Sequence, residues 1–568
     1  MLKRRPKNRR LLYAFRKGQE DIVKYVSRKG KTMPLLLTEI KMPVQAEAEL
    51  SALIAVQFKI PENSIKAVRI VRQSLDARKK QDIHFLVSAA VTLEAGAEAR
   101  LQKRADARVR PYAPIEDDHI PEGEETPRGR IVVAGLGPAG LFAAYVLALR
   151  GYRPLVLERG RRMEERKADV QRFWTGKEID SESNVMFGEG GAGTFSDGKL
   201  TTRIKDARAG VVLDTLRRFG APEDIVYQAK PHIGTDILQH VVKNMREEII
   251  AQGGEIRFET QLFDICVQDG ALRSVVVRQG GGEERIDCAA LVLATGQAAR
   301  DTYEMLYRRK IALLPKSFAV GVRIEHPQQL IDQAQFGALA GHPRLGAAEY
   351  RLAGKSGARG VYTFCMCPGG YVVGAASGKE EVVVNGMSDR ARDGQNANAA
   401  VIVQVGPEDF GNGPLDGIRF QRELEQQAYR AGLASGAYFA PAQRLEDFMK
   451  GRITKSFGAV TPTYRPGVHA TRLDTLLPEF VAVGLRDGIS AFSRQLAGYG
   501  MPDAVLTAVE SRTSAPVRIL RNASGEAEQA RGLFPVGEGA GYAGGIVSAA
   551  VDGMHAAERV AARYKAGQ

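Results

Sequence analysis

Two glycine-rich segments lie far apart in the chain, and each has a residue spacing that suits the binding of a negatively charged group. The first is GLGPAG, which matches the pattern G-x-G-x-x-G. Gly135 permits a tight turn, Gly137 lets backbone N–H groups approach a pyrophosphate, and Gly140 lets the next helix pack on the strand. The helix N-terminus then supplies N–H donors and partial positive charge. This segment predicts a dinucleotide site.

An acidic residue at the end of the next predicted strand supports this prediction. Glu158 follows Gly140 at the spacing where a carboxylate accepts hydrogen bonds from an adenosine ribose. A carboxylate there repels a 2′-phosphate, so the site favours FAD or NAD over NADP.

The second segment, GLFPVGEGAGYAGGI, distinguishes FAD from NAD. It predicts a short strand that ends at Gly537 and Glu538, followed by a helix that begins near Gly545. A second helix N-terminus suits the N1/C2 carbonyl end of a flavin, and Glu538 suits ribityl hydroxyls. A further predicted strand runs into Thr295 and Gly296 and would pass beside the cofactor.

Several polar residues are candidates for chemistry, each with a structural alternative. His232 titrates near neutral pH and suits proton transfer, but a structural histidine explains it equally well. Cys365 and Cys367 share one face of a strand and are either a redox pair or small buried side chains. No second Cys/His pair accompanies them, so no metal site is predicted. Three arginines are candidates either to clamp an anionic substrate or to form ion pairs: Arg323, Arg512 and Arg518.

The elements that position these residues predict an α/β protein with a Rossmann-like FAD-binding domain, an inserted α+β substrate domain and a small N-terminal α+β domain. The strand, turn, helix and strand from Arg130 to Leu157 form a βαβ unit. The predicted divisions are a basic extension (1–33), a small α+β domain (34–110), a linker (111–129), the first part of the FAD-binding domain (130–315), the inserted domain (316–531) and the C-terminal part of the FAD-binding domain (532–568).

Composition limits the other classes of function. The net charge is +14, but residues 1–32 hold twelve Lys or Arg against two acids, so the other residues carry only +4. This distribution argues against nucleic acid as a partner. The basic segment is an arm for nucleic acid or an acidic surface, an idle tail, or an upstream extension before Met33. Four cysteines make no disulfide framework, which favours the cytoplasm. No apolar run predicts a membrane span.

Further motifs resemble a bacterial family of FAD-dependent dehydrogenases with a glutathione-reductase-like FAD-binding fold. The motifs are MFGEGGAGTFSDGKLTTR (186–203), AKPHIGTDIL (229–238), TGQAARDTYEML (295–306), CMCPGG (365–370) and ESRTSAPVRI (510–519). The resemblance implies that the loop after Gly190 lies along the flavin, with Asp197 and Lys199 close to its ring. Lys199 would stabilise charge on the reduced flavin, or would simply be exposed. The resemblance implies a histidine directly after the turn at Gly296, but this chain has Gln297 at that position.

The sequence therefore predicts an oxidoreductase that transfers a hydride between flavin N5 and a small-molecule substrate, with NAD(P)H as a possible transient electron donor. A flavin-dependent RNA-modifying enzyme and a non-catalytic redox-sensing flavoprotein are the alternatives. The predicted FAD contacts are Gly135, Gly137, Pro138, Ala139, Gly140, Glu158, Arg159, Gly190, Gly191, Gly193, Thr194, Asp197, Thr295, Gly296, Gly537, Glu538, Gly544, Gly545 and Ile546.

Overall fold

The computed structural model describes residues 34–45, 48–112 and 122–566, so the predicted basic extension (1–33) lies outside the described residues. The chain divides into two compact units. The first holds the N-terminal residues together with Glu223–Pro231, and the second holds the rest.

The first unit is a small antiparallel sheet with two helices. Its strand order is β2-β3-β1-β4. The elements are β1 (Leu35–Pro43), α2 (Leu50–Phe58), β2 (Ile65–Asp76), β3 (His84–Leu93), α3 (Ala95–Lys103) and β4 (Val109–Pro111). Residues 223–231 join this unit, because Gln73 exchanges backbone hydrogen bonds of 2.7 and 2.8 Å with Tyr227 and Ala229. The motifs alone do not predict this pairing.

The second unit contains the predicted βαβ sheet. The strands are β5 (Arg130–Ala134), β6 (Leu155–Leu157), β7 (Glu255–Arg257), β8 (Gln261–Gln268), β9 (Ala271–Gln279), β10 (Gly282–Leu293) and β22 (Leu533–Pro535). β7, β6, β5, β10 and β22 pair in parallel in that order, and the hairpin β8–β9 pairs antiparallel with the first half of β10. The prediction of an α/β, Rossmann-like fold is confirmed.

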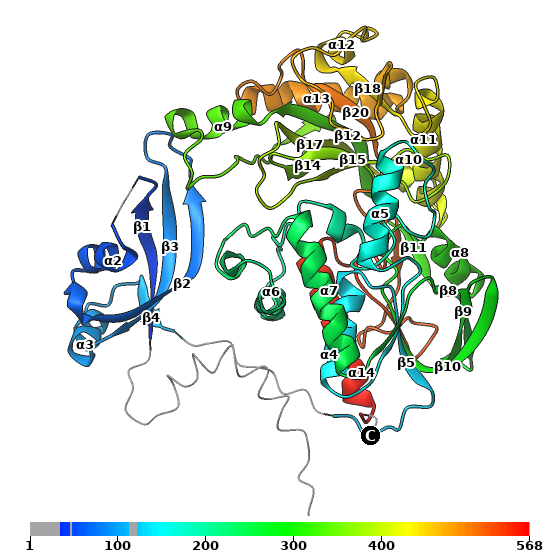
Figure 1. Ribbon diagram of the computed structural model, residues 1–568, viewed down its shortest axis with the longest axis horizontal. Helices are drawn as coiled ribbons and strands as arrows, with labels where there is room; N and C mark the ends of the chain where they lie inside the picture. The colour runs from blue at the N-terminus through cyan, green and yellow to red at the C-terminus, as the bar shows by residue number, and fades with distance from the viewer. Residues whose placement is uncertain (1–33, 46–47, 113–121, 567–568) are drawn as a thin grey trace, which may run out of the picture. The chain divides into compact units, whose positions relative to one another are not determined.

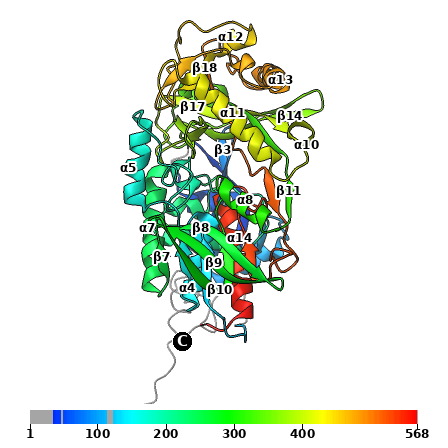
Figure 2. The same ribbon diagram turned by 90° about the vertical axis from the view of Figure 1, so that its right-hand side faces the viewer.

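Helices cover one face of this sheet and a β-layer covers the other (Figures 1 and 2). The helices of this region are α4 (Pro138–Leu149), α5 (Met163–Trp174), α6 (Arg208–Arg218), α7 (Thr235–Ala251), α8 (Arg300–Arg308) and α14 (Ile546–Arg563). α4 lies against both α7 and α14. On the other face, Val132 and Leu155 pack in one core with the β8–β9 hairpin and α8. Burial on both faces explains why β5 and β6 are continuously apolar.

The inserted region forms a second sheet of order β13-β14-β17-β12-β20-β18-β19, which is antiparallel except for the pair β18–β19. Its strands are β12 (Phe318–Pro327), β13 (Ala353–Ser356), β14 (Arg359–Cys367), β17 (Asn396–Val405), β18 (Ala440–Arg444), β19 (Val468–Ala470) and β20 (Val505–Glu510). Two strand pairs accompany it: β11 (Leu313–Pro315) with β21 (Val517–Ile519), and β15 (Tyr371–Gly374) with β16 (Val384–Met387). The helices are α9 (Gln328–Phe336), α10 (Pro407–Phe410), α11 (Asp416–Gly432), α12 (Leu445–Met449) and α13 (Glu479–Gln495).

The chain returns to the first sheet after the insertion. β22 pairs in parallel with β10, and α14 then packs on α4. Part of the predicted linker is also ordered, because Gly123 and Glu125 donate backbone hydrogen bonds of 2.8 and 3.1 Å to the end of α14. Among the described residues, no helix is both long enough and apolar enough to cross a membrane.

Candidate functional site

Three glycine-rich segments that are distant in the sequence meet at one place: the first turn (135–140), the loop (188–194) and the last turn (537–546). A Cβ on Gly191 would lie 2.9 Å from the Cα of Gly137. A Cβ on Gly193 would lie 3.2 Å from the side chain of Ile546, the first residue of α14. The loop therefore lies against both the first turn and the last turn.

The first turn has the geometry that its glycines predict. Gly135 has a φ of +96°, and a Cβ there would lie 2.4 Å from the carbonyl oxygen of Ala294. A Cβ on Gly140 would lie 1.9 Å from the carbonyl oxygen of Gly135, so neither position accepts a side chain without movement of the backbone. Gly137 caps α4 and Pro138 occupies its first turn, which leaves the helix N-terminus open.

Glu158 is buried at the end of β6 and binds three backbone amides. Its Oε2 accepts the N–H of Leu136 at 2.9 Å, and its Oε1 accepts those of Gly160 at 2.8 Å and Gly188 at 3.0 Å. Glu158 thus joins the first turn to the loop. A carboxylate has about four lone-pair sites, so one remains for a ribose hydroxyl.

Arg166 on α5 holds the loop from within, and sequence reasoning did not identify it. This fully buried guanidinium donates to the carbonyl oxygens of Glu189 and Gly191 at 2.5 and 3.0 Å, and to Oγ1 of Thr194 at 2.9 Å. Burial lowers the pKa of Arg166 to about 10, and the carboxylates of Glu158 and Glu189 oppose that shift. Thr194 also accepts a hydrogen bond through its carbonyl oxygen from Thr235, at the start of α7.

The last turn places a carboxyl group beside the strand end of β10. Nε2 of Gln297 donates to Oε1 of Glu538 at 3.1 Å and to the carbonyl oxygen of Arg512 at 2.8 Å. Burial raises the pKa of Glu538 to about 7, although the cation of Lys316 opposes this shift. Gln297, which departs from the expected histidine, thus orients this carboxyl group.

Asp197, Lys199 and His232 come together as a polar cluster. Asp197 accepts two hydrogen bonds from Arg392, at 3.0 and 2.5 Å, and its carboxylate lies 3.6 Å from Nζ of Lys199. Lys199 pairs through its backbone with His232. Nζ of Lys199 is buried and has no hydrogen-bond partner among the described residues. Burial and the charge of Arg392 lower the pKa of His232 to about 4, so its imidazole is neutral at pH 7.

Part of this chain matches a family model of FAD-dependent proteins. Residues 317–513 match the model described as "FAD-dependent protein, C-terminal domain-like", and residues 34–92 match a domain of unknown function. An uncharacterised protein of Clostridium beijerinckii is 49% identical over 515 residues, which span 90% of this chain and 95% of that protein.

The chain belongs to this family of FAD-dependent proteins.

Two solved structures are also similar to this FAD-dependent protein. A geranylgeranyl bacteriochlorophyll reductase-like protein of Thermoplasma acidophilum is 12% identical, with 76% of this chain and 78% of that chain covered and a TM-score of 0.32. Glycine oxidase of Bacillus cereus is 12% identical, with 76% of this chain and 94% of that chain covered and a TM-score of 0.29.

The residues at the meeting point suit an extended dinucleotide such as FAD. A Cβ at Gly296, Gly544 or Gly545 would meet no described atom within 4 Å, so the backbone there borders open space. The N-termini of α4 and α14 present backbone donors, and the buried carboxyl groups of Glu158 and Glu538 present acceptors. Phosphates require the donors and sugar hydroxyls require the acceptors. This FAD-dependent protein therefore has a donor and acceptor set that fits its cofactor.

Arg159, which the sequence predicts as a cofactor contact, lies among protein groups. Its guanidinium forms ion pairs with Glu182 at 2.8 Å and Asp301 at 3.0 Å and lies 4.2 Å from the ring centroid of Phe187. The contact between Arg159 and FAD remains a prediction.

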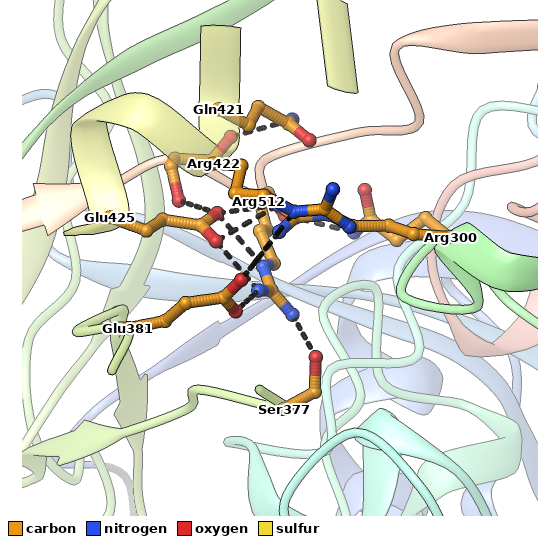
Figure 3. Close-up of polar contacts among 9 residues, drawn as sticks. Arg300, Ser377, Glu381, Gln421, Arg422, Glu425 and Arg512 are labelled. Atoms are coloured by element: carbon orange, nitrogen blue, oxygen red, sulfur yellow. Dashed lines mark hydrogen bonds and ion pairs between the residues drawn. The ribbon is translucent and has the colours of Figure 1, made fainter. Parts of the chain in front are cut away.

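The three arginines predicted as candidates for a substrate contact are engaged by the protein, which favours the structural alternative for them. Arg512 forms a buried cluster with Glu381 at 2.8 Å and Glu425 at 2.7 Å, and Arg300 on α8 joins the same two carboxylates (Figure 3). The cluster links α8 to α11 and to the segment that follows β20. Removing one member of a buried ion pair leaves an uncompensated charge.

Arg323 and Arg518 have other partners. Arg323 is fully buried and binds Glu510 at 2.7 Å and the carbonyl oxygen of Cys365 at 2.8 Å. Arg518 lies 5.0 Å from the ring centroid of Tyr542 in the last turn. Of the three, Arg518 is the one that lies beside the last turn, where the ring end of FAD is predicted.

Proposed function

We propose that this protein is an FAD-dependent oxidoreductase that transfers a hydride between flavin N5 and a small organic substrate. The observation that carries this proposal is the meeting of the first turn, the loop and the last turn, where the N-termini of α4 and α14 are both accessible. One helix N-terminus suits the pyrophosphate of FAD, and the second suits the carbonyl end of its ring.

The chain would hold FAD along these three segments. The N-terminus of α4 at Gly137 would bind the pyrophosphate, and Glu158 would accept the ribose hydroxyls. Glu538 would accept ribityl hydroxyls, and Gly545 at the N-terminus of α14 would donate to the ring. Bound FAD supplies the hydride chemistry, whereas the protein supplies orientation and electrostatics.

Lys199 and His232 are the proposed groups for charge and proton handling. Nζ of Lys199 lies 3.6 Å from the Asp197 carboxylate but makes no hydrogen bond within the described residues, so we propose that it donates to the ring, because a buried donor without an acceptor is costly. Nε2 of His232 lies 3.3 Å from the carbonyl oxygen of Arg390, so Nε2 carries the hydrogen and Nδ1 is the free acceptor. We propose that Nδ1 of His232 accepts a proton from the substrate.

A pocket beside the loop is the proposed substrate site. Its volume is about 310 Å³, which suits a small organic molecule. Its wall combines aromatic rings with charges of both signs and includes Trp174, Phe195, Tyr371, Lys167, Asp236 and Asp389. Phe195 directly follows Thr194 of the loop, so the pocket adjoins the proposed flavin site.

The test is to purify the protein and record its visible absorbance, then to add NADH and NADPH in turn without oxygen. Flavin absorbance that bleaches with either nucleotide would support the oxidoreductase and name its donor. Flavin that stays oxidised would direct the search to substrates that reduce it directly. If no flavin co-purifies and none can be reconstituted, the proposal is wrong.

A further inference from the structure

Cys365 and Cys367 form a close pair of thiols at the end of β14. Cys365 has a φ of +43°, a left-handed conformation that is uncommon for residues other than glycine. The pairing of β14 with β17 shifts between Phe364 and Cys367, so the strand is irregular at this point. Sγ of Cys367 lies 3.3 Å from the carbonyl oxygen of Cys365, and each of the two side chains shifts the pKa of the other. Because the two cysteines are two residues apart at an irregular point of the strand, modest movement could join their thiols.

The two thiols differ in accessibility. Cys365 is partly exposed, whereas Cys367 is fully buried. A small reagent would therefore reach Cys365 first. Cys367 is placed to act only on a group that is already attached to Cys365.

The charges around the pair favour a thiolate on Cys365. The side chain of Cys367 lowers the pKa of Cys365, and the cations of Lys199 and Arg323 lower it further against the effect of burial. The side chain of Cys365 and burial raise the pKa of Cys367. The charged groups that act on the pair are Lys199, Arg323, Asp197, Glu510 and Glu538.

Nζ of Lys199 can stabilise the negative charge of a thiolate on Cys365. Its buried Nζ has no hydrogen-bond partner among the described residues, and the carboxylate of Asp197 is already bound by Arg392. A thiolate is the nucleophilic form of cysteine, and a neighbouring lysine is a common reason for its formation.

We propose that Cys365 and Cys367 form a redox-active thiol pair that reduces a small disulfide. The thiolate of Cys365 attacks one sulfur of the disulfide RSSR, so that a bond forms between them, the S–S bond breaks and RS⁻ leaves. Cys367 then gives its proton to that thiolate and attacks Sγ of Cys365, and a second RS⁻ leaves. The pair loses two electrons and becomes a disulfide, while RSSR gains them and becomes RSH and RS⁻. This inference goes beyond the proposed function and does not require FAD.

The first experiment measures the reactivity of the thiols in the intact protein. Limited alkylation with iodoacetamide is followed against pH, and the modified peptides are quantified by mass spectrometry. Cys266, which is partly exposed on β8, serves as an internal reference. At about pH 6 we expect Cys365 to react at least tenfold faster than Cys266. Equal rates would overturn the proposal.

The second experiment uses glutathione disulfide as the probe. In the unaltered protein we expect the peptide that carries both cysteines to lose the mass of two hydrogen atoms without retaining glutathione. In Cys367→Ser we expect a stable mixed disulfide on Cys365, because the resolving thiol is absent. A mixed disulfide that persists in the unaltered protein would contradict the proposal.

A charge variant tests the part played by Lys199. We expect Lys199→Met to slow alkylation of Cys365 about tenfold near pH 6, the loss that follows from a shift of one pKa unit. Lys355→Met removes an exposed lysine from the neighbouring strand β13 and should leave the rate unchanged. An unchanged rate in Lys199→Met would show that this lysine does not support the thiolate and would overturn that step.

Discussion

Gln297 donates a hydrogen bond of 3.1 Å to Oε1 of Glu538, which joins the strand end of β10 to the last turn. These residues are far apart in the sequence, and each belongs to a segment that is predicted to border the flavin. The hydrogen bond fixes the direction of a carboxyl group whose pKa burial raises to about 7.

The raised pKa of Glu538 makes stability depend on pH in a specific direction. The folded protein retains this proton up to about pH 7, whereas the unfolded chain loses it at its ordinary value of 4.5. The contribution of this group is therefore fully present below about pH 4.5 and is lost as the pH rises through 7. At about pH 8 we expect Glu538→Gln to have a higher free energy of unfolding than the unaltered apoprotein, by on the order of 2 kcal/mol. At about pH 4 the two proteins should have equal free energies of unfolding. Denaturant titration measures both. A pH-independent difference would show that ionisation of Glu538 is not the cause.

Two glycines of the first turn should respond differently to replacement by alanine. In Gly140→Ala the new Cβ would lie 1.9 Å from a backbone oxygen, so we expect a loss of several kcal/mol in the free energy of unfolding. In Gly137→Ala the nearest atom would be 3.8 Å away, so the apoprotein should fold normally and only FAD binding should weaken. Thermal unfolding and flavin titration separate these effects.

A helical glycine elsewhere provides the control for this pair. Gly96 lies exposed in α3, where alanine is the better helix former. Gly96→Ala should leave FAD binding unchanged and slightly increase stability. Equal loss of FAD affinity in Gly96→Ala and Gly137→Ala would contradict the proposed pyrophosphate site.

Lys199→Met should make the bound flavin harder to reduce. An ammonium near the ring stabilises the added negative charge, so its removal lowers the reduction potential by about 30 mV for each tenfold loss of that stabilisation. Lys199→Arg keeps the charge and should keep most of the potential. Anaerobic equilibration with reference dyes measures both variants, and an unchanged potential in Lys199→Met would place this lysine away from the ring.

Arg512→Met should destabilise the protein strongly. It would leave the buried carboxylates of Glu381 and Glu425 without one of their two principal cations, which costs about 3 to 5 kcal/mol. Arg422 is the matched control, because its side chain is 40% exposed and it lies 3.8 Å from Glu381. Arg422→Met should cost less than about 1 kcal/mol. Chemical denaturation of the two variants provides the comparison, and similar losses would show that the buried cluster is not the reason.

The glycine-rich segments could be predicted from the sequence because their roles are local. Gly135 and Gly140 are required by the turn itself, and the acid at Glu158 follows at a fixed spacing. Arg166 could not be identified in the same way, because it lies in a charged helix segment, EERK, that is typical of an exposed face. Only the tertiary fold shows that its guanidinium is enclosed by the carbonyl groups of the loop.

Contacts between segments whose partners no local pattern specifies could not be predicted from the sequence either. The hairpin β8–β9 and the association of residues 223–231 with the first unit depend on partners that no local pattern specifies. The left-handed conformation of Cys365 is also unexpected, because it occurs at a residue other than glycine. The sequence therefore predicts the glycine-rich turns more completely than the backbone conformation at Cys365.

The pairing of β22 with β10 has a consequence for biosynthesis. The ribosome makes β5 and β10 first, then the whole inserted region, and only afterwards the strand and helix that would complete the proposed flavin site. Contacts of such long sequence separation form slowly. We therefore expect FAD to be captured only after nearly all of the chain has been translated, so cells that express this protein need free flavin and folding assistance at that late stage.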